Sequence, residues 1–450
     1  MLDVGRHPNI ELLAYSEVEK VEGEAGDFRI TVRRKARYVD EDKCTGCGAC
    51  KEKCPTIVPD AFNRGLGQRK AIYSWFAQGI PSTHTIDPQY CRQLNGKKCG
   101  VCKKGCKADA INFDQKERII ELEVASIIVA TGYDIFDPAL IHEYQYGKIA
   151  NVVTAIEFER LLSASGPTGG HLDRPSDRAI EAEIEELEKK AAKSQKVIGK
   201  FEEQHGESSA EFYTRYEKGE FKGDEEREKW AERYKEHLAI VEPLEALKKR
   251  AEGFSAAKRL AFIQCVGSRD ARFYPFCSGY CCMHSIKEAI IAHEHGSETT
   301  STIFGMDIRA VGKGFEEYKV RGGNNSNIRY ARGRVAEIIE GPDNNPIVVY
   351  EDTRERKVKE EEFDLVILAT ACAPNSGVKQ LAEILDIEID RFGFYKTSAN
   401  QPLDTSRPGI FVCGCAHGPM DIPESVAQAS SAAARAVQIV TASEKLRKAS

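Results

Sequence analysis

The amino-acid sequence predicts an α/β fold that is interrupted by two insertions. Two apolar segments, at 125–132 and 363–370, each end in an Ala-Thr turn, which is typical of buried strands. A cysteine-rich segment at 38–115 predicts a small α+β domain. A segment rich in Glu, Lys and Ala at 176–256 predicts a helical hairpin.

Length and charge bound what the chain can do. Its 450 residues suffice for about two or three domains, and 64 basic against 70 acidic residues argue against nucleic-acid and membrane-surface binding. No segment has the roughly 20 apolar residues of a membrane span, and no secretion signal is recognisable. The 15 cysteines have metal-like spacing, which indicates reduced thiolates. We therefore expect a soluble, cytoplasmic protein of an anaerobe.

The first group of cysteines has the spacing that binds a [4Fe-4S] cluster. Cys44, Cys47, Cys50 and Cys54, followed by Pro55, reproduce the C-x-x-C-x-x-C-x-x-x-C-P run of bacterial two-cluster ferredoxins. Three closely spaced thiolates ligate one face of a cube, whereas the fourth usually ligates a second cube. The run therefore predicts a second cluster as well as a first.

A second group of cysteines offers ligands for that second cluster. It consists of Cys91, Cys99, Cys102 and Cys106. Its first spacing is stretched by residues 93–98, and Lys107 replaces the usual proline. The alternative is a zinc ribbon, because paired C-x-x-C knuckles also bind tetrahedral zinc. Iron-sulfur clusters are favoured because the four thiolates of the first group, packed into 11 residues, would crowd a single ion.

Further elements are expected along the chain. Two strands should lie within 10–32, around Gly23 and Gly26, and the cysteine-rich block should close with a short strand at 110–113. The expected elements after the hairpin are a strand at 259–266, a helix at 285–295, a strand at 300–304 and a helix at 425–440.

The hairpin is expected to have its tip near Lys218–Asp224, where Gly219 and Gly223 interrupt the helical pattern. Apolar residues recur at three- and four-residue intervals from Ile180 onward. Two interpretations remain open, a solvated insertion with a thin apolar seam and a docking arm for a partner subunit.

The Ala-Thr turns also suggest a flavin. In flavoproteins of the disulfide-reductase type, such turns end the strands that link the flavin domain to the pyridine-nucleotide domain. We therefore place Thr131 and Gly132 beside a flavin. Residues 405–428 resemble the C-terminal flavin fingerprint of these proteins, in which a strand at 406–414 delivers a turn beneath the ribityl chain. The expected contacts there are Gly414, Cys415, Asp421, Ile422, Pro423, Ala427 and Gln428.

A helix that begins near Pro423 would point its positive dipole end and free amides at the flavin ring and stabilise negative charge. Cys415 stands where many relatives carry Asp, so its ribityl contact should be weaker or made by backbone. Asp421, Glu424 and Gln428 are candidate polar replacements, and taken singly each is better explained as a helix cap or surface residue. We interpret Cys413 and Cys415 as small packing residues beside the flavin and not as a redox pair.

Four segments spread over the chain carry a wider resemblance. They are LDVGRHPNI at 2–10, YVDEDKC at 38–44, LSASGPTGG at 162–170, and FIQCVGSRD at 262–270 with its continuation CSGYCCMH at 277–284. Together they resemble the HdrA family of heterodisulfide reductase subunits, flavin and iron-sulfur proteins of methanogens and many anaerobic bacteria. The resemblance implies a thioredoxin-reductase-like fold with two nucleotide domains, of which the FAD domain is incomplete.

The resemblance also implies a third [4Fe-4S] cluster close to FAD. The cysteines that correspond to its ligands are Cys265, Cys277, Cys281 and Cys282. The adjacent pair does not easily form an unstrained disulfide, and four thiols within 18 residues would be an oxidation liability without metal. The alternative is a set of buried structural cysteines.

The same segment replaces a nicotinamide site. In relatives that use NAD(P)H, the strand at 259–266 would run into a G-x-G-x-x-G turn that holds a pyrophosphate. Here the turn reads QCVGSR at 264–269, with a single glycine. Electrons should therefore arrive through iron-sulfur centres. An NAD(P)H-dependent disulfide reductase is disfavoured, because a C-x-x-C or C-x-x-x-x-C redox pair beside the flavin is also missing.

Six segments are expected. They are a FAD-domain segment at 1–37, a two-cluster ferredoxin-like domain at 38–115, a FAD-domain return and linker at 116–175, the helical hairpin at 176–256, a degenerate NAD(P)H-type domain with a cluster at 257–368, and a C-terminal FAD-domain segment at 369–450. Two parts of longer relatives are not found, the Rossmann unit before Met1 that holds the adenosine half of FAD and a C-terminal ferredoxin domain. Either a companion chain supplies the Rossmann unit, or the chain is a truncated product that cannot hold FAD alone.

The resemblance implies an oxidoreductase that is active only within a complex. Its function would be to relay electrons between three clusters and FAD, with flavin-based electron bifurcation as a further option. Implied partners are other heterodisulfide-reductase-like subunits, a hydrogenase or formate dehydrogenase module, and ferredoxin. The alternative function is a cluster-bearing scaffold or docking subunit that does not hold flavin by itself.

Overall fold

A computed structural model describes residues 2–221 and 223–449, and its largest sheet has five parallel strands in the order β10-β17-β11-β12-β13. These strands are β10 (Val152–Thr154), β11 (Arg259–Val266), β12 (Thr300–Gly305), β13 (Ile328–Arg332) and β17 (Leu365–Thr370). Along β11, Leu260 and Phe262 join one apolar core while Ala261 and Ile263 join another. The sheet is therefore buried on both faces, as is usual for parallel sheets.

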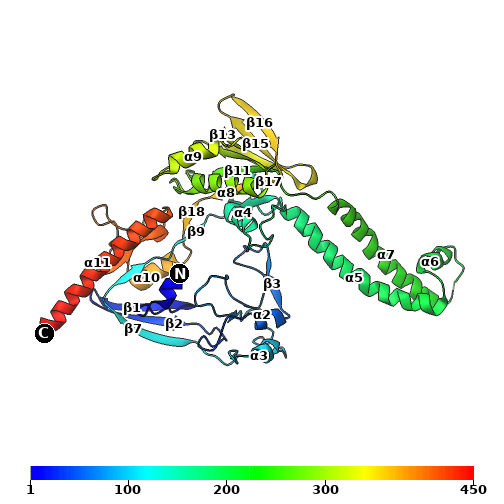
Figure 1. Ribbon diagram of the computed structural model, residues 1–450, viewed down its shortest axis with the longest axis horizontal. Coiled ribbons are helices and arrows are strands. Elements are labelled where there is room, and N and C mark those ends of the chain that lie inside the picture. Colours follow the sequence, from blue (N-terminus) through cyan, green and yellow to red (C-terminus); the bar gives the residue numbers. More distant parts are fainter. Residues whose placement is uncertain (1, 222, 450) are drawn as a thin grey trace.

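Each face of this sheet has its own cover (Figure 1). One face packs against α4 (Ala155–Leu162) and α8 (Cys281–His295), and α9 (Phe315–Gly323) lies beside α8 and β13. The other face contributes to a core with an antiparallel sheet and two short 3-10 helices. Those elements are β14 (Val335–Glu340), β15 (Pro346–Asp352), β16 (Lys357–Glu362), η1 (Pro138–Leu140) and η2 (His142–Tyr144), with η3 (Pro342–Asn344) joining β14 to β15.

A second region is built from small sheets and two helices. It contains the antiparallel sheet of β1 (Ser16–Glu24), β2 (Asp27–Arg34) and β7 (Arg118–Val124), the parallel pair β8 (Ile127–Val129) and β19 (Ile410–Val412), and the antiparallel pair β9 (Tyr133–Ile135) and β18 (Cys372–Pro374). The helices are α10 (Val378–Leu385) and α11 (Ile422–Ala449); α1 (Leu2–Arg6) and η4 (Gly414–Ala416) are short. Phe28, Val129, Leu385 and Ile410 share one core here, so segments from both ends of the chain fold together.

The cysteine-rich segment forms a separate small unit. Its elements are α2 (Ala49–Lys53), β3 (Ile57–Pro59), β4 (Gln68–Lys70), β5 (Ile72–Tyr73), β6 (Thr85–Ile86) and α3 (Val101–Gly105). Its two ends meet, because Asp40 N donates to Ala110 O at 2.7 Å and Asn112 N donates to Tyr38 O at 3.1 Å. The strand predicted at 110–113 is wrong: the segment meets residues 38–40 through one isolated bridge, Val39 to Ile111, and not through a longer ladder.

The helical insertion is an arm that projects away from the sheets (Figure 1). It consists of α5 (Pro175–His205), α6 (Ser209–Glu217) and α7 (Glu225–Ala251). The hairpin is present, and α6 is an additional helix at its tip. Gly206 ends α5 at φ 69°, and Gly219 and Gly223 also have positive φ. The tip of the hairpin is therefore longer than predicted. Lys222, which lies within the tip, is outside the described residues.

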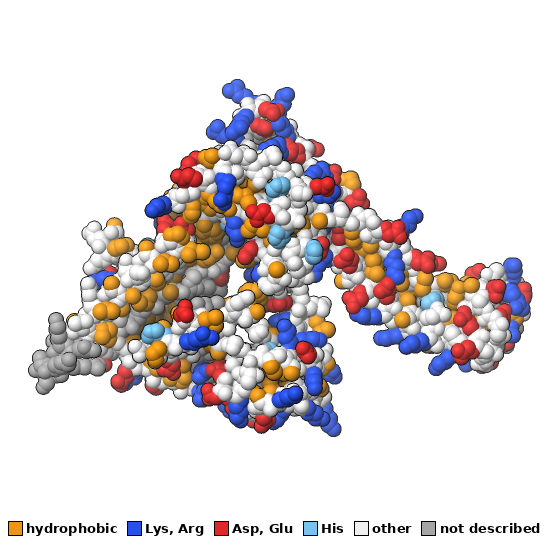
Figure 2. Space-filling view, viewed as in Figure 1, with side chains coloured by type: hydrophobic (Ala, Val, Ile, Leu, Met, Phe, Trp, Pro, Cys, Tyr) orange, Lys and Arg blue, Asp and Glu red, His pale blue; other side chains and the backbone are white. Residues whose placement is uncertain are grey.

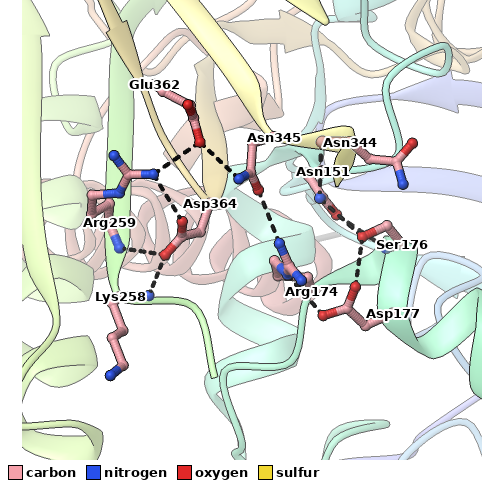
Figure 3. Close-up of polar contacts among 10 residues, drawn as sticks. All are labelled: Asn151, Arg174, Ser176, Asp177, Lys258, Arg259, Asn344, Asn345, Glu362 and Asp364. Carbon is pink, nitrogen blue, oxygen red and sulfur yellow. Dashed lines mark hydrogen bonds and ion pairs between the residues drawn. The ribbon is translucent and has the colours of Figure 1, made fainter. Parts of the chain in front are cut away.

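Polar contacts fix the base of the arm to the large sheet (Figure 3). Arg174 Nε pairs with Asp177 Oδ2 at 2.7 Å, and Arg174 Nη1 donates to Asn345 Oδ1 at 2.9 Å. On the returning side, the backbone amides of Lys258 and Arg259 donate to Asp364 Oδ2 at 2.7 and 2.9 Å. Both ends of the arm are thus tied to residues that flank β15, β16 and β17.

The structure differs from one expected boundary. Residues 116–175 were expected to return to the FAD domain and link it to the hairpin, but β10 is hydrogen-bonded to β17 and α4 packs on the same sheet. The large sheet therefore takes its edge strand from before the arm. Sequence periodicity does not reveal this, because β10 is only three residues long.

Candidate iron-sulfur and flavin sites

The cysteines of the small unit separate into two groups, and each group takes one member from the other sequence motif. Cys54 lies with Cys91, Cys99 and Cys102 around one small cavity. In the other group, the thiol of Cys50 interacts electrostatically with those of Cys44 and Cys106. This exchange arises because α2 and α3 pack together, and Cys54 and Cys106 each follow one of these helices in extended conformation.

Burial governs the protonation of the innermost thiols. It raises the pKa of Cys50 and of Cys102 to about 11. Cys47 is exposed, and a hydrogen bond from the backbone of Ala49 lowers its pKa. Ala110 N donates to Cys106 Sγ at 3.4 Å, a type of contact that tunes cluster potentials. Binding iron at the buried thiols therefore has to release protons.

The separation of these thiols bears on the zinc alternative. Among residues 2–221 and 223–449, no group of three or more His, Cys, Asp or Glu has an arrangement that could hold a metal ion. A tetrahedral zinc draws its sulfur ligands to about 2.3 Å from one centre. In a cubane each cysteine binds a different iron, so the four sulfurs lie further apart. The described residues therefore present no ready-made zinc site.

The third group of cysteines gathers where β11 meets α8. Cys281 and Cys282 are the first residues of α8, and Cys281 interacts electrostatically with Cys282, Cys265 and Cys277. Cys265 has the left-handed φ of 61°, which re-aims its side chain at a register shift of β11. Burial raises the pKa of Cys282 to about 11 and that of Cys281 further. Gly279 N donates to Cys277 Sγ at 3.4 Å and Arg309 N to Cys282 Sγ at 3.5 Å.

A buried carboxylate anchors the loop between Cys265 and Cys277. Asp270 Oδ2 pairs with Arg272 at 2.9 Å and with Arg334 at 2.7 Å, and its side chain is 7% exposed. Hydrogen bonds from Arg272 are the main cause that holds the pKa of Asp270 well below its ordinary value. The loop is thereby fixed to the start of β14.

We expect the Asp270→Asn variant to be less stable by about 2–3 kcal/mol, because charge-assisted hydrogen bonds are lost in a buried place. Denaturant unfolding monitored by iron-sulfur absorbance measures this. Since folding lowers this pKa, the wild-type contribution is present above about pH 4 and is lost as the pH falls further. The variant should lack this acid-dependent loss; an unchanged pH profile would contradict the assignment.

The turn after β11 does not have the form of a pyrophosphate site. Gly267 has φ 78°, and a Cβ placed on it would lie 2.3 Å from the ring of Phe136. This glycine is therefore required for packing. The ring of Phe136 thus covers the backbone at this glycine.

Two glycine turns that carry predicted flavin contacts lie at the ends of neighbouring strands. β8 and β19 are parallel neighbours, and Cys413 N donates to Val129 O at 3.1 Å, so the turns at Thr131–Gly132 and Gly414–Cys415 leave adjacent strands at the same end. Gly132 and Gly414 have φ 70° and 67°, and a Cβ on Gly132 would meet nothing within 4 Å. Crevices at the carboxyl ends of parallel strands are common ligand sites. The open backbone at Gly132 leaves room for a flat cofactor there.

Gln428 holds one of these turns in place. Its Oε1 accepts from Gly414 N at 3.0 Å, and its Nε2 lies 3.2 Å from His417 Nδ1. His417 Nε2 in turn lies 2.9 Å from Thr397 Oγ1. Gln428 therefore fixes the turn at Gly414. The other predicted flavin contacts on α11, which are Ile422, Pro423 and Ala427, are exposed.

The N-terminus of α11 caps itself. Glu424 N donates to Asp421 Oδ1 at 2.8 Å, and Asp421 N donates to Glu424 Oε2 at 3.0 Å. These contacts form a reciprocal capping arrangement. The expectation of free amides here is therefore wrong for Asp421 and Glu424, and their two carboxylates offset the positive end of the helix dipole. Asp421 is a helix cap, as the sequence allowed.

Sequence reasoning missed three residues at this site. Cys372 is buried beside the third cysteine group, where its backbone N donates to Ser278 Oγ at 2.9 Å. The rings of Tyr133 and Tyr280 are 5.8 Å apart, in the same place between the third cysteine group and the glycine turns. The sequence carried one signal that could have identified Cys372: this residue lies two positions after the second Ala-Thr turn.

One known family matches a short segment of this chain, and other known proteins match almost its whole length. The family model for a 4Fe-4S binding domain matches residues 37–56. An HdrA iron-sulfur subunit of CoB–CoM heterodisulfide reductase from Methanopyrus kandleri is 42% identical over 99% of this chain and 56% of its own length. The HdrA subunit of the H2:CoB–CoM heterodisulfide,ferredoxin reductase from Methanothermobacter thermautotrophicus is 38% identical over 97% of this chain and 54% of its own. Among solved structures, thioredoxin reductase of Lactococcus lactis covers 82% of this chain and 86% of its own at TM-score 0.36 and 15% identity.

The chain is thus an iron-sulfur protein with a [4Fe-4S] binding domain. It belongs to the HdrA family of heterodisulfide reductase subunits, to which almost its entire length is homologous, and this confirms the resemblance seen in the sequence. It spans about half the length of the curated relatives it matches. No described helix has the length and apolar character needed to cross a membrane.

Proposed function

We propose that this chain relays electrons between three [4Fe-4S] clusters and FAD within a heterodisulfide-reductase-like oxidoreductase complex. One observation carries the proposal: the third cysteine group adjoins the two open glycine turns. Tyr133, which follows Gly132, has its ring centroid 5.8 Å from that of Tyr280, which precedes Cys281. A cluster and a flavin held there would be neighbours, which electron transfer requires.

Each cofactor would have its own set of residues. The cluster ligands are Cys44, Cys47, Cys50 and Cys106 for the first, Cys54, Cys91, Cys99 and Cys102 for the second, and Cys265, Cys277, Cys281 and Cys282 for the third. Thr131, Gly132 and Gly414 would line the FAD site in a thioredoxin-reductase-like arrangement. FAD supplies exchange of one or two electrons when bound. That property would also allow bifurcation, with ferredoxin and a hydrogenase or formate dehydrogenase module as partners.

The isolated strand pair and the exposed apolar face at the proposed FAD site suggest that a further unit covers them. Among the described residues, β8 and β19 pair only with each other, and two-stranded parallel sheets are unusual because parallel sheets are normally larger and covered. Ile128 is 40% exposed on β8, and apolar side chains gather along α11, where Val426 and Val437 are 59% and 60% exposed (Figure 2). We propose that a Rossmann-type unit extends this sheet and covers this face.

The isolated pair of β8 and β19 also favours the second candidate function, a cluster-bearing scaffold. A scaffold protein would keep its clusters and hold no flavin by itself, because a two-stranded sheet and a self-capped α11 offer few contacts for FAD. Flavin absorbance of the chain alone, and of the chain with a companion Rossmann-type unit, separates the two functions. Flavin bound only with the companion supports a shared site, and no flavin in either supports the scaffold.

Reconstitution tests the relay. We expect about twelve iron atoms per chain after loading with iron and sulfide, and EPR signals that interact when reduced. FAD bound with its companion should be reduced through the clusters, and NADH should not bind. Fewer than about eight iron atoms, or a protein that holds only zinc, would remove the relay as described.

A further inference from the structure

The turn that follows β11 places a cation beside the third cysteine group. Arg269 Nη1 donates to Cys265 Sγ at 3.9 Å. The side chain of Arg269 is only 19% exposed, and water and salt screen a partly buried charge much less than an exposed one. Because a guanidinium stays protonated in proteins, the positive charge next to Cys265 is permanent.

Asp307 holds this guanidinium in place. Its two carboxylate oxygens accept from Arg269 Nη1 at 2.5 Å and from Arg269 Nη2 at 3.3 Å. Such a forked pair of hydrogen bonds fixes the orientation of the guanidinium plane as well as its position. Asp307 lies two residues after β12, and the Nε of Arg309 in the same loop is 3.6 Å from its Oδ2. The carboxylate that orients Arg269 therefore comes from the strand next to β11.

The backbone of Arg269 is constrained as well. It has the left-handed φ of 54°, which is uncommon for a residue with a side chain. Its N donates to Phe276 O at 2.9 Å, and Ser268 Oγ donates to the same carbonyl at 3.0 Å. Residues that their surroundings hold in this conformation are concentrated at functional sites. The backbone and the carboxylate together keep the guanidinium against Cys265.

We propose that Arg269 raises the reduction potential of the third cluster and that Asp307 is its positioning residue. This inference rests on the proposed function, because it requires a [4Fe-4S] cluster on the third cysteine group. Reduction of such a cluster adds one negative charge. A fixed positive charge that also donates a hydrogen bond to a ligand sulfur stabilises the reduced form more than the oxidised form.

Redox titration followed by EPR measures this effect in the anaerobically purified, cluster-loaded protein. The signal of the third cluster is the one that Cys281→Ala abolishes. Arg269→Gln should lower its midpoint potential by about 59 mV or more, which is a tenfold change in the one-electron equilibrium. Arg269→Lys keeps the charge and should lower the potential less. Lys313→Gln removes a charge from an exposed position between β12 and α9 and should leave the potential unchanged. The signals of the other two clusters should not move in these variants.

Pulsed EPR of the wild type decides the contact even if an Arg269 variant fails to fold. Protein whose arginine guanidinium groups carry the heavy nitrogen isotope should show coupling of that nitrogen to the reduced third cluster. The coupling should vanish in Arg269→Lys and weaken in Asp307→Ala; an undiminished coupling in Asp307→Ala would overturn the role of Asp307.

The two levels of the proposal fail in different ways. If three clusters are present but the coupling is absent, or the potential in Arg269→Gln is unshifted, the role of Arg269 is wrong and the relay stands. About eight iron atoms per wild-type chain, with no third signal, would instead overturn the third cluster and the relay that depends on it.

Discussion

Replacing Cys44, Cys47 and Cys50 together with alanine should expose the thiol of Cys106 and leave Cys54 protected. The three substitutions remove most ligands of one proposed cluster, so about four of about twelve iron atoms should be lost. Cys106 becomes free because it interacts with Cys50 in this group. Cys54 stays bound because it lines the other cavity with Cys91, Cys99 and Cys102.

The reciprocal variant supplies the control. Alanine at Cys91, Cys99 and Cys102 should release Cys54 to alkylation and keep Cys106 protected, again with a loss of about four iron atoms. Anaerobic alkylation of the native protein, followed by peptide mass spectrometry, reads both cysteines at once. If each fourth cysteine instead became free together with its own sequence motif, the exchange of ligands would be wrong. Loss of all iron in either variant would show that the small unit folds only when both clusters are present.

The spacing of the cysteines predicted much of the small cysteine-rich unit, because cluster ligation is a local property. The turns that hold Cys44 to Cys54 depend on residues within one short run, and the run therefore predicts its own geometry. The same holds for β11, whose observed bounds of Arg259–Val266 match the predicted strand. An eight-residue apolar run with its own boundaries leaves few alternatives.

Contacts between distant segments were harder to predict from the sequence. Tyr133 meets Tyr280 only because β9 and the start of α8 are brought together, and no local pattern records that approach. The pairing of β10 with β17 is of the same kind, since a three-residue strand carries little periodicity. At α11 the sequence offered both a flavin contact and a helix cap for Asp421. The cap was realised because Glu424 lies three residues later and completes the reciprocal contacts.

The tip of the arm is expected to depend on one tryptophan. Trp230 is fully buried, its ring stacks on Phe212 at 3.9 Å and on His205 at 5.1 Å, and its Nε1 donates to Ser209 Oγ at 2.9 Å. Phe212, Trp230 and Ala231 form an apolar cluster of their own, separate from the cores around the sheets. We expect Trp230→Ala to destabilise the tip by about 3–5 kcal/mol, because a large cavity replaces the ring.

The effect of Trp230→Ala should stay within the arm. The base of the arm is held by Arg174, Asp177 and Asp364, which this substitution does not touch (Figure 3). Hydrogen exchange should therefore rise across 201–234 while iron content stays at about twelve per chain. Lys229→Ala, an exposed neighbour, should change neither quantity. Loss of iron would show that the arm is coupled to the cluster sites. If iron is retained but the complex no longer assembles, the arm is a docking element; if both are retained, it is a solvated insertion.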